Sequence, residues 1–533
     1  MNPLLLTDGY KTGHHQQYPQ GTTLVYSNFT PRSNKYAPKG CDKVVSFGQQ
    51  MVMMQIHEAF QNEFFSKPKD EVCGEMKREL SMYLGTDYDV THFEKLHDLG
   101  YLPIHVKILE EGTLVPMKVP ILTIYNTHPD FYWVTNYLET IISNLLWKPA
   151  TSATIAHQYR KVLTSWQEKT DKERAWFIDW QGHDFSMRGM DSIDATISSG
   201  LGHLTSFSGT DSLPAIGGAR KYYGETGFVG GSVNATEHSV MCSITEFKKI
   251  EVEEEYQVEV TYDDNGNIIE TRKRTVSKTV TDELNGIRGL LAKYPTGILS
   301  MVSDTFDLWR MCTEYLPALK EEILARDGKL VIRPDSGNPV DIICGRSLSK
   351  LERVEYGGKG LQPEHKGVIE LLWDVFGGTI NEQGYKVLDP HIGAIYGDSI
   401  TIDRAEEICT RLEAKGFAST NIVLGVGSFT YQYNTRDTFG FAMKATYVEV
   451  NGEGREIFKD PITDDGMKKS ATGLLQVVKV MAPDSLGGLH QTGYQLVDKV
   501  SWEKENIGEL QTLYRDGKFV KLTTLTDVKT RLK

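Results

Sequence analysis

The sequence predicts an α/β protein with an irregular β/α barrel core and a second mixed α+β, β-rich domain formed by the N-terminal and C-terminal segments. Between about residue 176 and residue 430, short apolar runs alternate with helical segments, which is typical of a parallel sheet covered by helices. Polar, chemically functional residues follow these runs, where β/α barrels place their sites. An open doubly wound sheet is the structural alternative, because it also gathers ligands at the ends of its strands.

Residues 1–150 are expected to form the N-terminal part of the β-rich domain with its connecting helices. Strand-like runs there read "TTLVYSNF" and "VPILTIYNT", around a helical stretch near Gln49–Ser66. Two longer segments, Phe131–Trp147 and Ser152–Lys169, repeat apolar residues every three or four positions. That period predicts two helices, each with a buried face.

Residues 151–440 are expected to form the barrel. Its strand candidates end in polar clusters and read "WFIDW", "GILSMVSD", "KLVIRPDSGNP", "HIGAIYGDS" and "NIVLGVGSFT". Residues 247–290 interrupt the pattern with charged, alternating sequence around Asp-Asn-Gly, which predicts an exposed β-hairpin insertion. Residues 441–533 return to strand-like alternation and are expected to complete the β-rich domain.

The composition excludes several classes of protein. The formal net charge of −13 argues against a nucleic-acid-coating protein, since phosphate backbones need a basic face. Six scattered cysteines form no C-x-x-C pair, which favours a reducing compartment. The N-terminus lacks the basic region of a signal peptide, and no run approaches the roughly 20 apolar residues of a membrane span. We therefore expect a cytoplasmic protein with no nucleic-acid or membrane partner.

Acids and bases stand at several strand ends. One such Asp is weak evidence, because Asp is also a common helix N-cap. Acids at four strand ends, together with a histidine and an arginine, make capping a poor explanation of the whole set. The residues are Asp211, His238, Asp304, Arg333, Asp335 and Asp398.

The segment "RPDSGNP" is the most specific of these. Arg333 offers a planar fork for a phosphate or carboxylate, and Asp335 can hold sugar hydroxyls or a metal-bound phosphate. The alternative is a plain turn with a surface ion pair. The loops "GVGS" and "YGDS" could place phosphate at a helix N-terminus, although a simple strand-to-helix turn is the better explanation of each one alone. No Walker-type sequence is present.

The stretch "GSVNATEHSVM" (231–241) permits two interpretations of His238. Asn234 could cap a helix, with Glu237 completing a capping box three residues later. The same histidine could instead belong to an active site. Cationic residues near both ends of the chain, among them Lys11, Arg32, Lys444 and Lys459, are by default solvated surface groups.

Seven motifs in order resemble the nicotinamide phosphoribosyltransferase family, a type II phosphoribosyltransferase family. They read "LLLTDGYKTGHHQQYP", "HDFSMRG", "FSGTD", "ATEHS", "VSDTFD", "IRPDSGNP" and "FKDP", and the likeness extends to about residue 475. It implies a homodimer with shared active sites and a β/α barrel core. The implied reaction joins nicotinamide to phosphoribosyl pyrophosphate (PRPP), giving nicotinamide mononucleotide (NMN) and pyrophosphate in NAD salvage.

The resemblance also implies roles for individual residues. Nicotinamide would be held by Phe185, by Arg188 and Asp211 at its amide, and by Tyr10 of the partner subunit. PRPP and NMN would lie against Asp8, Ser300, Asp304, Arg333, Asp335, Gly397, Asp398, Gly427 and Ser428. Pyrophosphate or the ATP phosphates would be held by Arg32, Arg436, Lys444 and Lys459.

In this family ATP phosphorylates a histidine, which the motif places at His238, with Glu237 orienting it. Mg²⁺ would accompany the phosphates, with no ligand directly assigned. The closest alternative function is nicotinate phosphoribosyltransferase, against which Asp211 argues because a carboxylate repels the nicotinate carboxylate. A binding protein that lacks catalysis and a glycosidase are more distant alternatives, the latter having no need of the Arg and Lys set.

Overall fold

The computed structural model describes residues 1–257, 271–348, 361–397, 399–459, 470–483 and 489–533. They form two compact units, which are described one at a time. Unit 1 comprises residues 1–164, 176–231 and 426–533, and unit 2 comprises residues 165–175 and 232–425. The domain limits expected at residues 150 and 440 stay a prediction. In the described residues no helix has both the length and the hydrophobicity needed to cross a membrane.

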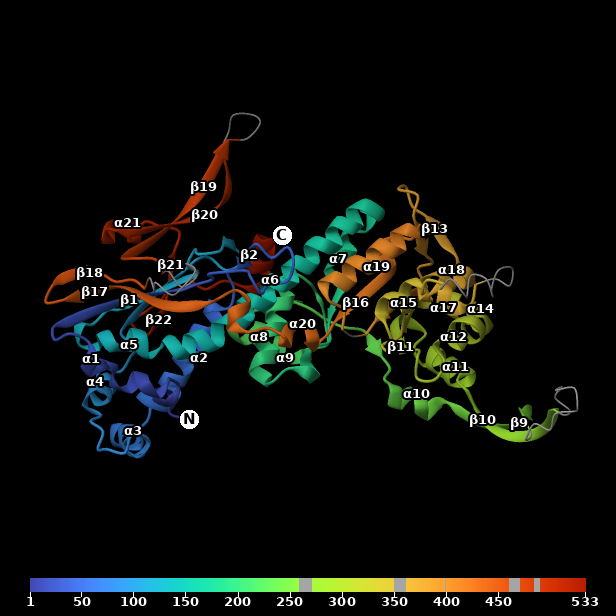
Figure 1. Cartoon of the computed structure of the whole chain (residues 1–533), viewed down its shortest axis with the longest axis horizontal. Coiled ribbons are helices and arrows are strands. Elements are labelled where there is room, and N and C mark those ends of the chain that lie inside the picture. Colours follow the sequence, from blue (N-terminus) through green and yellow to red (C-terminus); the bar gives the residue numbers. More distant parts are fainter. Residues whose placement is uncertain (258–270, 349–360, 398, 460–469, 484–488) are drawn as a thin grey trace, which may run out of the picture. The chain divides into compact units, whose positions relative to one another are not determined.

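An antiparallel sheet with the strand order β18-β17-β1-β5-β3-β21-β22 forms the centre of unit 1 (Figure 1). Strands from the two ends of the chain pair directly, so that Asn28 lies opposite Lys444. The prediction of a β-rich domain built from the N-terminal and C-terminal segments is confirmed. The strands are β1 (Thr22–Thr30), β3 (Ile104–Ile108), β5 (Leu122–Asn126), β17 (Ala442–Val450), β18 (Glu453–Glu456), β21 (Gln511–Arg515) and β22 (Lys518–Phe519).

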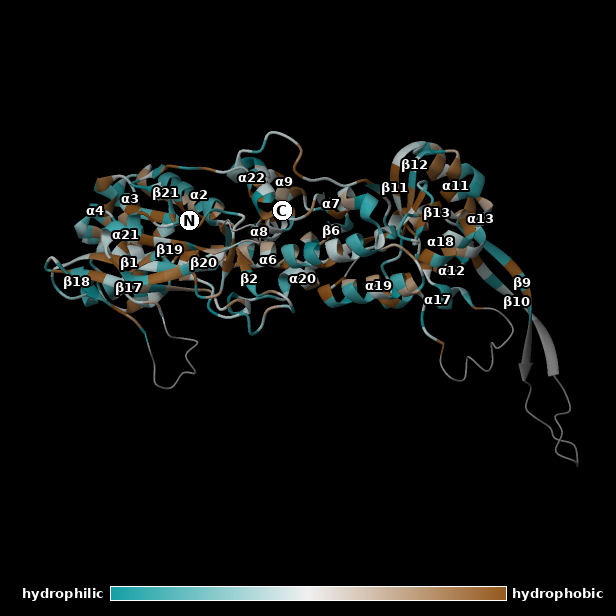
Figure 2. Ribbon diagram, turned by 90° about the horizontal axis from the view of Figure 1, so that it is seen from above, coloured by the Kyte–Doolittle hydropathy of each residue, from teal (hydrophilic) through white to brown (hydrophobic). Residues whose placement is uncertain are grey.

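Helices in unit 1 carry hydrophobic and hydrophilic residues on the same element, as covering helices do (Figure 2). Helix α2, for example, buries Met51, Ile56 and Phe60. The helices are α1 (His14–Gln17), α2 (Gln49–Phe60), α3 (Lys69–Leu84), α4 (Thr91–Leu99), α5 (Tyr132–Tyr137), α7 (Ile178–Gln181), α8 (Ile193–Leu204), α9 (Leu213–Tyr223), α20 (Ser428–Gln432), α21 (Trp502–Asn506) and α22 (Leu525–Leu532). Two further strand pairs are β2 (Lys43–Val45) with β4 (Leu114–Pro116) and β19 (Leu474–Pro483) with β20 (Leu489–Val500).

The two long helices expected over Phe131–Trp147 and Ser152–Lys169 are in fact the short α5 and one long helix, α6 (Glu139–Thr170). The expected break between them was wrong, because α6 continues through Pro149. Proline removes one backbone hydrogen bond from a helix. Here Leu146 and Ala153, on either side of it, are completely buried, so tertiary packing holds both halves in line. Gly48 has no Cβ, which leaves room for the Pro149 ring.

The parallel strands follow the order β7-β6-β16-β15-β12-β11-β8. Within unit 2, β11 pairs in parallel with both β8 and β12, and β15 pairs with β12 and β16. Within unit 1, β6 pairs in parallel with β7, and a parallel bridge joins Gly209 of β7 to Gly231. The predicted irregular β/α barrel is confirmed. The strands are β6 (Gly182–Asp184), β7 (Gly209–Thr210), β8 (Asn234–Ala235), β11 (Thr296–Val302), β12 (Asp327–Arg333), β15 (Ile392–Tyr396) and β16 (Ile422–Val426).

Between β8 and β11 the chain forms helix α10 (His238–Ile244), an antiparallel hairpin of β9 (Glu246–Gln257) and β10 (Thr271–Asp282), and helix α11 (Leu284–Lys293). The expected Asp-Asn-Gly turn lies outside the described residues. The remaining elements of unit 2 are α12 (Leu308–Arg310), α13 (Leu316–Ala318), α14 (Lys320–Leu324), α15 (Pro339–Cys344), α17 (Pro363–Lys366), α18 (Val368–Phe376), α19 (Ile402–Ala414), β13 (Gly378–Ile380) and β14 (Lys386–Leu388).

A buried ion pair joins the C-terminal segment to the sheet of unit 1. Lys107 of β3 donates from Nζ to Glu505 Oε2 in α21 at 2.7 Å, and the two side chains are 5% and 0% exposed. Lys107 also donates to the backbone carbonyl of Glu505, and Tyr26 donates its hydroxyl hydrogen to Glu505 Oε1. Each charge therefore has several partners, which a buried pair requires.

Glu505→Gln is expected to lower the free energy of unfolding by about 3 kcal/mol, because it leaves the Lys107 ammonium buried without a counter-charge. The matched control is Glu509→Gln, which removes the partner of Lys479 from a pair whose side chains are 45% and 31% exposed. That change is expected to cost less than about 1 kcal/mol. Urea titrations of the two variants measure the difference; equal losses would contradict the interpretation.

Candidate active site

In unit 2, His238 lies between two polar side chains that follow neighbouring strands. Its Nε2 is 3.3 Å from Asp335 Oδ1, and its Nδ1 is 3.1 Å from Thr305 Oγ1. His238 follows β8, Thr305 follows β11 and Asp335 follows β12. These strands are parallel neighbours, so their ends meet at one edge. The side chains of His238 and Asp335 are 48% and 35% exposed, so a ligand can reach them.

Asp304 fixes the turn that carries Asp335. Its Oδ2 accepts hydrogen bonds from the backbone amides of Asp335 at 2.9 Å and Ser336 at 2.8 Å. Its other oxygen, Oδ1, is buried and has no hydrogen-bond partner among the described residues. His238, Asp304 and Asp335 each offer one ligand atom, and these atoms lie within 4.8 Å of one another. The arrangement can hold a cation.

Arg333, at the end of β12, donates from Nη2 to the backbone carbonyl of Thr236. The hydroxyl group of Ser300 in β11 is buried and unpartnered within the described part of the chain. Gly397, after β15, approaches so closely that a Cβ there would lie 3.1 Å from Cβ of Asp335. The structure therefore brings Ser300, Arg333 and Gly397 close to the strand ends that carry His238 and Asp335. Asp398 lies outside the described residues.

The expected capping box before His238 was wrong. Asn234 lies in β8, and Glu237 is itself the N-cap residue of α10, with no capping hydrogen bond from its side chain. Pairing of Asn234 with Leu299 of β11 keeps Asn234 extended. The carboxylate of Glu237 accepts a hydrogen bond from the Ser239 hydroxyl, whereas the ring nitrogens of His238 face Thr305 and Asp335.

In unit 1, a second group of predicted residues gathers around β6 and β7. His183 Nε2 lies 3.0 Å from Asp211 Oδ1, and the His183 and Phe185 rings are 4.5 Å apart. The Asp211 side chain is 40% exposed. Arg188 lies on the 3₁₀ helix Met187–Gly189 that follows Phe185. A Cβ on Gly189 would clash with the Ser428 side chain, so Ser428 of α20, which follows Gly427, lies against this segment.

A third group, also in unit 1, is cationic. Glu139 accepts a hydrogen bond from Lys11 Nζ at 2.8 Å and lies 3.8 Å from Lys444 Nζ. Burial lowers the pKa of Lys444, and the nearby charges of Arg32, Lys11 and Lys459 lower it further, while Glu139 opposes them. Excess positive charge at one place favours an anionic ligand.

Three predicted residues lie at the surface of unit 1. Arg436 forms a 3.3 Å ion pair with its neighbour Asp437. Asp8 accepts a hydrogen bond from the Thr140 hydroxyl at 2.7 Å. Tyr10 is 66% exposed and shares one 3₁₀ helix with Lys11.

Sequence reasoning missed His183, Thr305 and Glu139 as members of these groups. His183 stands two residues before Phe185 and Thr305 directly follows Asp304, so both lie inside motifs that had been recognised. Glu139 gave no such signal, because it reaches the cations only through tertiary structure.

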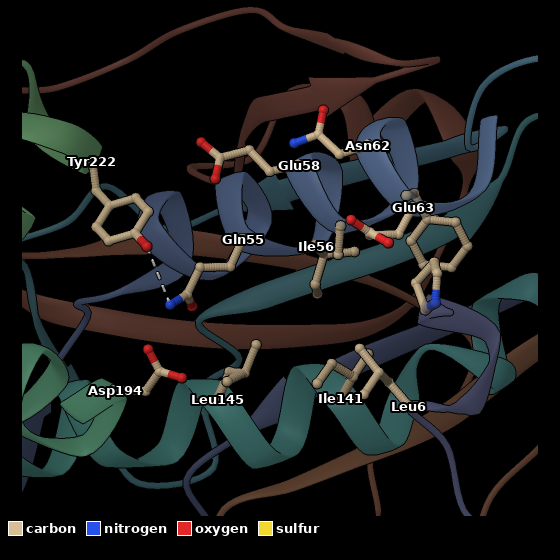
Figure 3. A pocket seen from close by; sticks show the side chains of 13 residues that line it. Leu6, Gln55, Ile56, Glu58, Asn62, Glu63, Ile141, Leu145, Asp194 and Tyr222 are labelled. Carbon is tan, nitrogen blue, oxygen red and sulfur yellow. Dashed lines mark hydrogen bonds between the residues drawn. The ribbon is translucent and has the colours of Figure 1, made fainter. Parts of the chain in front are cut away.

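A cavity of about 480 Å³ lies elsewhere in unit 1, between α2 and α6 (Figure 3). Gln55 on its wall donates from Nε2 to the Tyr222 hydroxyl at 3.5 Å. Apolar residues such as Ile56 and Leu145 line it together with Glu58. None of the predicted site residues is among its lining.

Two models of known protein families match the parts of the chain that carry these motifs. Residues 180–484 match the model of the nicotinate phosphoribosyltransferase (NAPRTase) family. Residues 2–96 match the model described as nicotinamide phosphoribosyltransferase, N-terminal domain. The two matches include every motif on which the groups above depend.

Curated relatives extend over almost the whole chain. The nicotinamide phosphoribosyltransferase of Acinetobacter baylyi is 45% identical, covering 100% of this chain and 97% of its own length. That of Mycoplasma pneumoniae is 32% identical, covering 86% of this chain and 92% of its own. Among solved structures, human nicotinic acid phosphoribosyltransferase has a similar fold, with a TM-score of 0.51 at 14% identity, covering 99% of this chain and 92% of that one.

Proposed function

The chain belongs to the nicotinamide phosphoribosyltransferase family, and on that premise we propose that it joins nicotinamide to PRPP with ATP coupled through phosphorylated His238. It is an enzyme of the pentosyltransferase class. The products are NMN and pyrophosphate. The observation that carries the proposal is the Asp211 carboxylate, which is accessible beside the Phe185 and His183 rings.

In this proposal unit 1 recognises the base. Phe185 stacks on one face of the pyridine ring, since aromatic faces bind flat rings at little entropic cost. Asp211 accepts a hydrogen bond from the carboxamide NH₂, and Arg188 lies near the carboxamide oxygen. His183 Nε2 lies 3.0 Å from Asp211 Oδ1 and so helps to fix the orientation of this carboxylate. Nicotinate brings a carboxylate instead of an amide donor, and two carboxylates repel each other.

We assign the phosphoribosyl group mainly to the strand ends of unit 2. Asp304, Asp335 and Ser300 would contact the ribose, with Arg333 on phosphate. Attack of the pyridine nitrogen at C1 of PRPP breaks the bond to pyrophosphate oxygen and leaves positive charge on the ring system. Carboxylates placed nearby stabilise that charge as it develops. Gly397, Asp398, Gly427 and Ser428 are assigned to the 5′-phosphate and ribose.

The cationic group of unit 1 suits the leaving pyrophosphate. The departing pyrophosphate is stabilised by the positive charges of Arg32, Lys444 and Lys459. Arg436 adds a further positive charge. The proposal includes a homodimer in which Asp8 and Tyr10 of one protomer serve the site of its partner. The exposure of Tyr10 supports this, because a large aromatic ring that remains 66% exposed beside His14 and Lys11 leaves apolar surface for a second protomer to cover. A cytoplasmic location is part of the same proposal.

Mg²⁺ fits the carboxylates of Asp304 and Asp335, which lie beside the His238 ring. Asp304 Oδ1 is buried without a partner among the described residues, and carboxylate oxygens are the ligands Mg²⁺ prefers. When bound, the ion would neutralise charge on the phosphates. The protein's own contribution is to hold the two carboxylates in place through the Asp304 hydrogen bonds to the turn.

The contacts of His238 support Nδ1 as the acceptor nitrogen in the proposed phosphorylation. A carboxylate only accepts hydrogen bonds, so neutral His238 facing Asp335 carries its proton on Nε2. Nδ1 then holds the lone pair and accepts a hydrogen bond from the Thr305 hydroxyl. Nδ1 attacks the γ-phosphorus of ATP, the bond to the β–γ bridging oxygen breaks, and ADP leaves. Asp335 stabilises the proton that stays on Nε2.

Purified protein is expected to form NMN from nicotinamide, PRPP and Mg²⁺, and to use nicotinate at least about 100-fold less efficiently, since the wrong substrate leaves like charges facing each other. Asp211→Asn should reduce that preference by about tenfold or more. Asp130→Asn, which neutralises an exposed acid elsewhere in unit 1, is the control and should keep it. Rates with both bases give the ratio; equal or better use of nicotinate by the native protein would establish the alternative, nicotinate phosphoribosyltransferase.

His238→Ala is expected to abolish the stimulation of NMN synthesis by ATP while leaving measurable ATP-independent synthesis, because the base and ribose contacts do not need the imidazole. Parallel assays with and without ATP check this. Undiminished ATP stimulation in the variant would exclude His238 as the phosphoryl acceptor.

A further inference from the structure

We propose that the root of the β9–β10 hairpin is a positioning element for the phosphoryl acceptor, acting through the contact of Phe247 with Phe306. This rests on the proposed phosphorylation of His238. The hairpin begins two residues after α10 ends, and α10 begins with His238. In both views it projects away from the other elements of unit 2 (Figures 1 and 2).

Helix α10 has little to hold it by itself. It is seven residues long, and Met241 is its one buried residue. A helix of this length is not stable without tertiary contacts. At its C-terminal end the Ile244 carbonyl packs on α11, where a Cβ on Gly286 would lie 2.4 Å from that oxygen. The hairpin connects α10 to α11, so its root sets the position of both.

The root is attached at two points to the chain that follows β11, once before α12 and once at α12 and the turn of helix after it. Phe247 meets Phe306 edge to face, with ring centroids 6.0 Å apart. On the other strand, the Thr281 carbonyl accepts hydrogen bonds from Arg310 Nη1 at 2.8 Å and from the Tyr315 hydroxyl at 3.3 Å. A two-stranded hairpin is marginally stable in water, so these contacts fix where it lies.

The same segment carries the partners of the phosphoryl acceptor. Thr305, next to Phe306, contacts His238 Nδ1, and Asp304 holds the turn of Asp335. The hairpin root and His238 therefore contact adjacent residues of one short segment from two sides. Phe247 is 60% exposed and Phe306 is 39% exposed, so their pairing adds little to the core. The pairing of Phe247 with Phe306 instead fixes the position of the neighbouring Thr305 hydroxyl.

Removing the Phe247 ring frees the segment to move, and a misplacement of about 1 Å can cost about 100-fold in a positioned reaction. Phe247→Ala is expected to slow formation of acid-labile phosphoprotein from radiolabelled ATP by about tenfold or more at saturating ATP, with KM for ATP little changed. Phe247→Tyr keeps the ring and should restore the native rate. Phe306→Ala should behave as Phe247→Ala does.

Ile250→Ala is the matched control. It removes another exposed apolar side chain, 41% exposed, from the opposite face of the same strand, and should phosphorylate at the native rate. Thermal unfolding of each variant shows whether a slow variant is also unfolded. Native rates in both Phe247→Ala and Phe306→Ala would overturn the inference.

A second variant keeps the root and removes the distal arm, by replacing residues 252–276 with Asn-Gly between the opposed residues Glu251 and Ser277. The native phosphorylation rate is expected. A loss as large as that of Phe247→Ala would show that the distal arm acts by another route and would overturn the assignment to the root. No phosphoprotein in native enzyme that still makes NMN would instead overturn the ATP step of the proposed function, and this inference with it.

Discussion

Two hydrogen bonds to one carboxylate oxygen fix the turn on which the site in unit 2 depends. Asp304, which follows β11, accepts hydrogen bonds from the backbone amides of Asp335 and Ser336. These bonds connect the end of β11 to the turn that follows the neighbouring strand β12. Hydrogen bonds to a charged acceptor are stronger than those between neutral groups. Because Asp335 faces His238, this tie sets the distance between the carboxylate and the imidazole. The catalytic proposal depends on that distance.

The cationic group of unit 1 has the opposite sign of charge to the chain as a whole. The chain as a whole is acidic, with a formal net charge of −13, yet burial lowers the pKa of Lys444 and the charges of Arg32, Lys11 and Lys459 lower it further. When no ligand is bound, Glu139 offsets part of the repulsion among these cations through its contacts with Lys11 and Lys444. In the proposed function, a bound polyphosphate would supply several further counter-charges to this group. A negative net charge therefore does not exclude an anionic ligand, because the local charge at the binding site decides which ligand is attracted.

Much of the fold could be predicted from the sequence, because strand and helix periods differ and the strand ends of a β/α barrel meet at one edge. That reasoning brought His238, Asp304 and Asp335 together before any coordinates. It failed at Pro149, where burial on both sides outweighs a lost backbone hydrogen bond, and at Asn234, which pairs as a strand residue although its side chain suits a cap. Glu139 was missed because it reaches the cations only through tertiary structure, whereas His183 and Thr305 lay unassigned inside motifs that had been recognised.

The proposed phosphorylation requires that Asp335 hold the proton on His238 Nε2 and leave Nδ1 to accept the phosphoryl group. NMR of protein labelled with ¹⁵N-histidine and treated with ATP determines which nitrogen is phosphorylated. We expect phosphorus coupled to Nδ1 of His238. Phosphorus on Nε2 would contradict it, because that nitrogen could not then donate its hydrogen bond to Asp335.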